Sequence, residues 1–254
     1  MTTILTSHRS CSSPILATDL LDRVIGPRRF RAVVSDRQDG DFHPFHNADG
    51  SLDSRQQRLI GRRFWMVNQV HGTAVLDTEA ANRWPVLGRA DVIVSNHRSP
   101  KPVGVWAADC APIALFGAAG TVVGVRAGWR GLASGVVDVA ADVLLHRGES
   151  VAAVVVGPMI HPDCYAFGLE QLTAVAHGVG AEADAITAIT ADGGAALDVP
   201  AAVTAALRRR DLAPDVLGDC TGCNPRWFSH RVRSDTERHA LVAWIEPARA
   251  TVRT

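Results

Sequence analysis

The chain has 254 residues and a mass of 27.1 kDa, which is enough for one substantial hydrophobic core. Lys+Arg and Asp+Glu balance at 26 each, so the chain lacks the basic field that is typical of nucleic-acid-binding proteins. Hydrophobic residues make up 47%, but no uncharged apolar stretch is long enough to span a membrane, and the first residues do not resemble a secretory signal. We therefore expect a globular, cytoplasmic protein with no nucleic-acid or membrane partner.

Periodicity and turn residues predict the elements in chain order. Residues 1–60 are polar and irregular, and residues 35–51 are expected to form a long loop. Apolar runs then predict strands over residues 63–68, 91–95, 103–108, 112–116 and 121–126. Apolar residues at helical spacing predict a helix over residues 132–146, and the continuous apolar run over 151–157 predicts a strand that is buried on both faces. Two more helices are expected over residues 169–178 and 200–210, and a last strand over 241–245. Strands and helices are mixed and linked by short turns, which predicts a single-domain α/β (α+β) fold with a mixed sheet.

Reactive side chains beside glycines fall at the ends of predicted strands. His71 follows one strand in NQVHGT, and Asp109 and Cys110 lie between two strands in AADCAPI. A buried carboxylate needs a partner, and a strand end that opens on a cleft is a natural place for one. Each residue also has a structural interpretation, because a lone histidine is commonly a turn residue and a lone cysteine a small buried hydrophobe. Together they make this region the first candidate site.

A third segment, RAGWRGLASG, runs from a strand into a helix. Its strand-to-helix junction near Gly131 can present backbone N–H groups to an anion, and Arg130 can bind phosphate with two hydrogen bonds. Such junctions are common in α/β folds, so the segment alone indicates no particular ligand.

Other cysteines and histidines are weaker candidates. The pair Cys220 and Cys223 forms one CxxC without a second matched pair, which disfavours a zinc knuckle. His43 and His46 lie in the polar loop and are expected to be solvated. The segment GPMIHPDCYAFG is expected to form a turn at a sheet edge.

In combination and in order, these segments resemble the YfiH-type laccase-domain family. The resemblance rests on NQVHGTAV, ADVIVS, AADCAPIAL, AGWRGLASG, GPMIHPDCYAFG and CTGCNPRWFSHRVRSDTER, which run from about residue 68 to 238. Members of this family were once named multicopper polyphenol oxidoreductases and are now regarded as purine nucleoside phosphorylases with accompanying adenosine deaminase activity. The resemblance implies one laccase domain over residues 1–254, with residues 1–60 divergent, and a mixed sandwich flanked by helices and related to a bacterial deamidase toxin.

The resemblance also implies a metal site, usually zinc, held by His, Cys and His. Carried onto this sequence, two of the ligands are His71 and Cys110, but the third position is Arg126. Arginine stays protonated and cannot serve as a metal ligand, so this departure disfavours zinc unless His161 or His230 replaces it. Copper is less expected still, because the sequence contains no His-x-His pair of the kind that multicopper oxidases need.

The leading hypothesis is a purine nucleoside phosphorylase that cleaves purine nucleosides with phosphate, with adenosine deamination as the accompanying activity that the resemblance implies. In it His71, Asp109 and Cys110 carry the catalysis, whereas phosphate is bound by a second group, Arg126, Arg130 and Gly131. A binding or regulatory paralogue without metal chemistry and a Cys–His hydrolase are the alternatives, and a copper phenol oxidase is disfavoured. The sequence leaves the oligomeric state open.

Overall fold

The computed structural model describes residues 18–46, 50–80, 84–98 and 100–248. Its largest element is a six-stranded sheet, in which the four central strands pair antiparallel and one further strand pairs in parallel at each edge. In spatial order the strands are β13 (Val216–Leu217), β10 (Val151–Val156), β8 (Ala111–Gly117), β9 (Val122–Ala127), β6 (Val92–Ser95) and β4 (Val75–Asp77).

A second, four-stranded antiparallel sheet packs against the first. Its order is β1 (Thr18–Ile25), β2 (Arg28–Val34), β14 (His239–Pro247) and β7 (Val103–Ala107). Two short pairs complete the described strands, namely β3 (Met66–Asn68) with β5 (Val86–Arg89) and β11 (Thr187–Ile189) with β12 (Ala195–Leu197).

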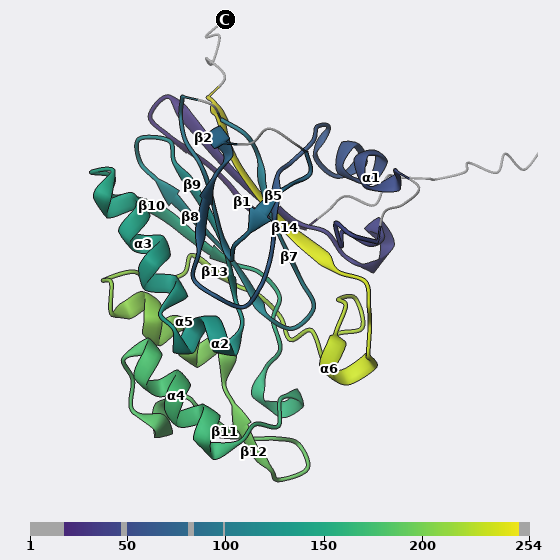
Figure 1. The fold of residues 1–254 in the computed structure, drawn as a ribbon, viewed down its shortest axis with the longest axis vertical. Helices are drawn as coiled ribbons and strands as arrows, with labels where there is room; N and C mark the ends of the chain where they lie inside the picture. The colour runs from purple at the N-terminus through teal and green to yellow at the C-terminus, as the bar shows by residue number, and fades with distance from the viewer. Residues whose placement is uncertain (1–17, 47–49, 81–83, 99, 249–254) are drawn as a thin grey trace, which may run out of the picture.

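The helices lie outside the sandwich (Figure 1). One face of the six-stranded sheet is covered by α2 (Trp129–Ala133), α3 (Val136–His146), α4 (Leu169–Val179) and α5 (Val199–Arg208). On the other side of the molecule, α1 (Ser51–Ile60) packs near the four-stranded sheet and α6 (His230–Arg233) precedes β14.

The central strands are apolar on both faces because they separate two cores. On β8, Ile113 and Leu115 point into the core beneath the helices, whereas Ala114 and Phe116 point into the core between the sheets. This double burial explains the continuous apolar runs, and the predicted mixed sandwich flanked by helices is confirmed. No helix in the described ranges is long and apolar enough to cross a membrane.

Two predictions of local structure were wrong. Residues 1–60 are not irregular throughout, because the part that the structure describes contains β1, β2 and α1. The charged side chains of this hairpin are paired across its surface, as in the Arg29–Asp22 ion pair. The helix expected over 132–146 is divided into α2 and α3, since Gly135 has a left-handed φ of 76°.

Acid should destabilise the fold through His239, the first residue of β14. Burial lowers the pKa of His239 from 6.5 to about 3, so this side chain is neutral in the folded protein. The unfolded chain binds a proton below its ordinary pKa of 6.5, so the stabilisation is fully present above that value and is lost as the pH falls towards 3. At about pH 4 we expect a loss of about 3 kcal/mol in unfolding free energy. Urea unfolding at several pH values measures it.

A His239→Leu variant is the control for this prediction, because it removes the titrating group and keeps an apolar side chain at the site. Its loss of stability on acidification should be smaller than that of the parent by about 3 kcal/mol. Equal losses in the two proteins would contradict the assignment.

Candidate active site

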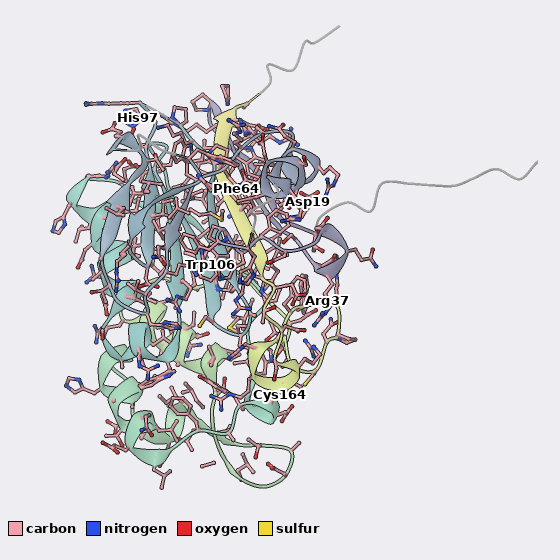
Figure 2. The ribbon with its side chains drawn as sticks, turned by 45° about the vertical axis from the view of Figure 1, so that its right-hand side comes forward. Asp19, Arg37, Phe64, His97, Trp106 and Cys164 are labelled. Atoms are coloured by element: carbon pink, nitrogen blue, oxygen red, sulfur yellow. The ribbon has the colours of Figure 1, made fainter. Side chains whose placement is uncertain are left out.

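A cleft of about 330 Å³ opens where the ends of β7, β8 and β9 meet the segments before α2 and around α6. This volume falls at the lower end of the range of about 300–1,000 Å³ for small-molecule sites. Its lining residues come from widely separated parts of the chain: Gln69, His71, Trp106, Ala107, Ala108, Asp109, Cys110, Arg126, Trp129, Tyr165, His230, Arg231 and Arg238. Trp106, on β7, lies near the middle of the molecule in Figure 2.

The cleft brings together most of the predicted site residues, including the catalytic candidates His71, Asp109 and Cys110 as well as Arg126 and His230. Three predicted residues do not line it. Arg130 is exposed and its guanidinium stacks over the Trp129 ring at 4.2 Å. Gly131 is buried beneath Val136. His161 contacts the carbonyl of Gly218 through Nε2 at 3.1 Å.

Backbone strain marks two of the residues in the cleft. His71 and Asp109 have φ values of 64° and 93°, in the left-handed region that residues with a Cβ seldom adopt. Asp109 lies in the tight connection between β7 and β8, and His71 follows β3. Such conformations cost free energy and persist where the surrounding structure requires them, which is a feature of functional sites.

Arg126 forms a buried ion pair with Asp91 at the floor of the cleft. From β9, its Nε and Nη2 donate to Oδ1 of Asp91 at 2.8 and 2.5 Å. The second oxygen of Asp91, Oδ2, accepts from the backbone N–H groups of Val70 at 3.1 Å and Gly72 at 2.6 Å. Both side chains are almost fully shielded from solvent. Asp91 therefore ties Arg126 to the segment that carries His71.

Cys110 and His71 converge on Gly128, the residue before α2. A Cβ atom built on Gly128 would lie 2.9 Å from Cys110 Sγ, 3.2 Å from His71 Cδ2 and 3.6 Å from Arg126 Nη1. Glycine is therefore needed there, because any side chain would separate the thiol from the imidazole. The remaining guanidinium nitrogen of Arg126, Nη1, lies 3.7 Å from Cys110 Sγ.

This geometry does not fit the three-ligand zinc centre that the sequence motifs imply. Two donors, His71 and Cys110, are present, but the third position holds a guanidinium that cannot bind a cation. Asp91 does not replace it, because its carboxylate oxygens are engaged by Arg126, Val70 and Gly72. Although His71 is partly exposed, burial of its ring and then the charge of Arg126 lower its pKa to about 4.

Asp109 connects the cleft to the segments near the C-terminal end of the described chain. Its Oδ1 accepts from the Thr221 hydroxyl at 2.7 Å, and its Oδ2 accepts from the backbone N–H of Arg231 at 2.6 Å. The carboxylate is buried, so these two hydrogen bonds satisfy it. Asp109 thereby fixes the position of Arg231 at the edge of the cleft.

Aromatic rings and guanidinium groups share the walls. Arg231 lies over the Tyr165 ring with its Cζ 5.0 Å from the centroid, and burial raises the pKa of Tyr165 to about 12. Burial also lowers the pKa of Arg238. The Gln69 side chain hydrogen-bonds the backbone of Trp106: its amide donates to the Trp106 carbonyl at 2.6 Å, and its oxygen accepts from the Trp106 backbone N–H at 3.2 Å.

Sequence reasoning missed several of these residues. The lining side chains Arg231, Arg238 and Trp129 lie inside the quoted family motifs, which was a signal that they belong to the site. His43 was expected to be solvated, and this was wrong. It is half-buried, its ring lies 4.6 Å from the Trp106 ring, and burial lowers its pKa to about 4.

Known proteins share this fold. A solved Neisseria meningitidis structure superimposes with a TM-score of 0.71 at 22% identity, covering 91% of this chain and 99% of that one. The similarity places the fold among those of YfiH-type proteins. A family model described as multi-copper polyphenol oxidoreductase laccase matches residues 51–246. The chain belongs to this laccase-domain family.

Several relatives of this chain are named as purine nucleoside phosphorylases. A purine nucleoside phosphorylase of Mycobacterium tuberculosis is 33% identical over 193 residues, covering 74% of this chain and 74% of the relative. A purine nucleoside phosphorylase of Pseudomonas aeruginosa is 32% identical over 240 residues, covering 87% of this chain and 95% of the relative.

Proposed function

We propose that this chain is a metal-independent purine nucleoside phosphorylase. The observation that carries the proposal is the pairing of aromatic rings with guanidinium groups in one cleft of about 330 Å³, next to His71 and Cys110. A purine needs a flat apolar surface and phosphate needs fixed cationic donors, and this cleft offers both. The names of the relatives agree with this reading.

The two substrates are assigned to different walls of the cleft. We assign the base to the rings of Trp106, Trp129 and Tyr165, because a purine stacks on aromatic faces. We assign phosphate to Arg231 and Arg238, which face the same space and supply charged hydrogen-bond donors. These two arginines take the place of Arg130 and Gly131, which lie outside the lining.

The reaction then needs one displacement and one proton transfer. A phosphate oxygen forms a bond to C1′ of the ribose, the C1′–N9 bond breaks, and its electron pair goes to the purine. The proton that hydrogen phosphate loses balances the proton that the departing base gains. His71 is neutral at neutral pH because its pKa is about 4, so its two ring nitrogens can accept one proton and donate another. Cys110 and Arg126 line the cleft next to His71.

Deamination of adenosine requires an activated water. A zinc-bound water ionises near neutral pH only where about three protein ligands hold the ion. Because Arg126 fills the third position, we propose that adenosine yields adenine and not inosine. A zinc-bound water at His71 and Cys110 therefore has no part in the proposed reaction.

Product analysis tests the proposed function directly. Purified protein incubated with adenosine should release adenine and ribose 1-phosphate when phosphate is present, and nothing without it. Arg238→Gln should raise the KM for phosphate about tenfold with a smaller change in the KM for adenosine, because it removes one charge-assisted hydrogen bond. Arg130→Gln is the matched control, since Arg130 is exposed outside the cleft.

Other outcomes identify the two alternatives. A raised melting temperature with adenosine but no product at high enzyme concentration would support a binding module and contradict the phosphorylase. The Cys–His hydrolase rests on the convergence of Cys110 and His71 on Gly128, with Arg126 Nη1 3.7 Å from Cys110 Sγ. It predicts cleavage of a substrate without phosphate, abolished by Cys110→Ala. Inosine formation would overturn the metal-independent assignment.

A further inference from the structure

Three cysteines gather at a second place, outside the cleft. Cys164 ends the 3₁₀ turn η3 (Pro162–Cys164), and Cys220 and Cys223 follow β13. Their Sγ atoms all lie within 4.8 Å of one another, and those of Cys164 and Cys223 are 3.3 Å apart. Cys220 is buried, Cys164 is half-buried and Cys223 is exposed. None of them lines the cleft.

Two backbone N–H groups are directed at the buried sulfur of this thiol cluster. The N–H groups of His161 and Cys223 both point to Cys220 Sγ, at 3.3 and 3.4 Å. Hydrogen bonds of this kind to a ligand atom orient the ligands of metal centres.

Gly222 allows the turn that carries Cys220 and Cys223 to pack closely against Cys164. A Cβ atom on Gly222 would lie 2.6 Å from both Cβ and Sγ of Cys164. The turn between Cys220 and Cys223 is held further by Arg233, whose Nη1 and Nη2 donate to the carbonyls of Gly222 at 2.8 Å and Thr221 at 2.6 Å. Figure 2 shows Cys164 close to α6, the helix that carries Arg233.

The separations suit a metal ion better than a disulfide. Zn–S bonds of about 2.3 Å at tetrahedral angles hold sulfur atoms about 3.8 Å apart, which lies between the 3.3 Å pair and the 4.8 Å limit of this cluster. A Cys164–Cys223 disulfide would leave out Cys220, the sulfur that receives both N–H groups. Zinc prefers thiolate ligands, and the exposed side at Cys223 leaves room for a water as the fourth ligand.

We propose that Cys164, Cys220 and Cys223 form a zinc-binding site, separate from the catalytic cleft. The ion would link Cys164 to the turn between Cys220 and Cys223. That turn contains Thr221, whose hydroxyl donates to Asp109 at 2.7 Å. The zinc site would therefore fix one wall of the cleft without touching the reacting atoms. The proposal is independent of the phosphorylase assignment, because it depends only on these three cysteines and their backbone donors.

Zinc titration of the whole chain tests the proposal. Protein that has been reduced and freed of metal is titrated with zinc(II) against a chromophoric chelator. One equivalent should bind to the parent protein, and Cys223→Ser should weaken that binding by at least about tenfold. Cobalt(II) gives an independent readout, because thiolate-to-cobalt charge-transfer bands should appear in the parent protein and disappear in the variant.

Matched variants separate this site from the other cysteines. Cys110→Ser alters the cleft, and Cys11→Ser removes the cysteine that lies outside the described residues, and both should keep the zinc affinity of the parent. Cys223 is exposed, so its substitution should preserve the fold, which circular dichroism checks. Unchanged affinity in Cys223→Ser, or a Cys164–Cys223 disulfide in protein that binds no zinc, would overturn the proposal.

Discussion

Arg126→Met should lower the free energy of unfolding by about 3–5 kcal/mol, because it leaves the Asp91 carboxylate buried without its counter-ion. Asp91 is 1% exposed, and the Arg126 side chain is its sole charged partner among the hydrogen bonds described. In a chain of this size the change corresponds to a fall of about 6–20 °C in melting temperature. Methionine keeps much of the length and apolar volume of the arginine stem, so the charge is the main difference. Chemical and thermal unfolding measure the effect.

The double variant Arg126→Met/Asp91→Asn is the control. An asparagine at position 91 can keep a carbonyl oxygen facing the N–H groups of Val70 and Gly72, while its amide replaces the oxygen that faced Arg126. The double variant therefore has no unpaired carboxylate at position 91 and retains the turn around His71. We expect the double variant to recover about half of the lost stability. A double variant that is no more stable than Arg126→Met would contradict the ion-pair argument.

Asp109→Ala should lower kcat/KM for the proposed phosphorolysis by about 100-fold, mainly through a higher KM for phosphate. The substitution removes both hydrogen bonds that hold Thr221 and Arg231 at the cleft. It also places alanine at a φ of 93°, which a Cβ-bearing residue other than Asn or Asp tolerates poorly. Steady-state kinetics with phosphate and adenosine varied separately measure the split, which a general loss of folded protein would not produce.

Asp109→Asn separates position from charge. Asparagine tolerates a positive φ, its carbonyl can accept from the Arg231 N–H, and its amide can donate to the Thr221 hydroxyl. If Asp109 is a positioning residue, this variant should keep activity within a few-fold of the parent. A loss as large as that of Asp109→Ala would show that the carboxylate charge itself is needed.

Strands that are buried on both faces were predicted from the sequence, whereas strands with a charged face were not. Strands β6, β8, β9 and β10 are apolar runs because both of their faces are covered, and such runs are easy to recognise. The β1–β2 hairpin was missed because one of its faces carries ion pairs such as Arg29–Asp22, which read as a polar segment. The division between α2 and α3 depends on one glycine φ that hydrophobic spacing does not reveal.

The site was predicted where its residues are close in sequence and missed where the fold joins distant segments. Asp109 and Cys110 were found because they are adjacent at a strand end. The pairing of Arg126 with Asp91 depends on β6 lying beside β9, a register that periodicity does not specify. Cys164 and Cys223 are 59 residues apart, so the CxxC pair appeared to lack a partner.

The position of β14 constrains the order in which the protein can assemble during synthesis. This strand lies between β2 and β7 and pairs with both, yet it is made after every other described strand. Until residue 247 has left the ribosome, β2 and β7 each lack the strand that pairs with them between the two, and an unpaired strand edge can recruit other chains. The nascent protein therefore has a late closing step, and Arg238, one residue before β14, takes its place in the cleft only when that step occurs.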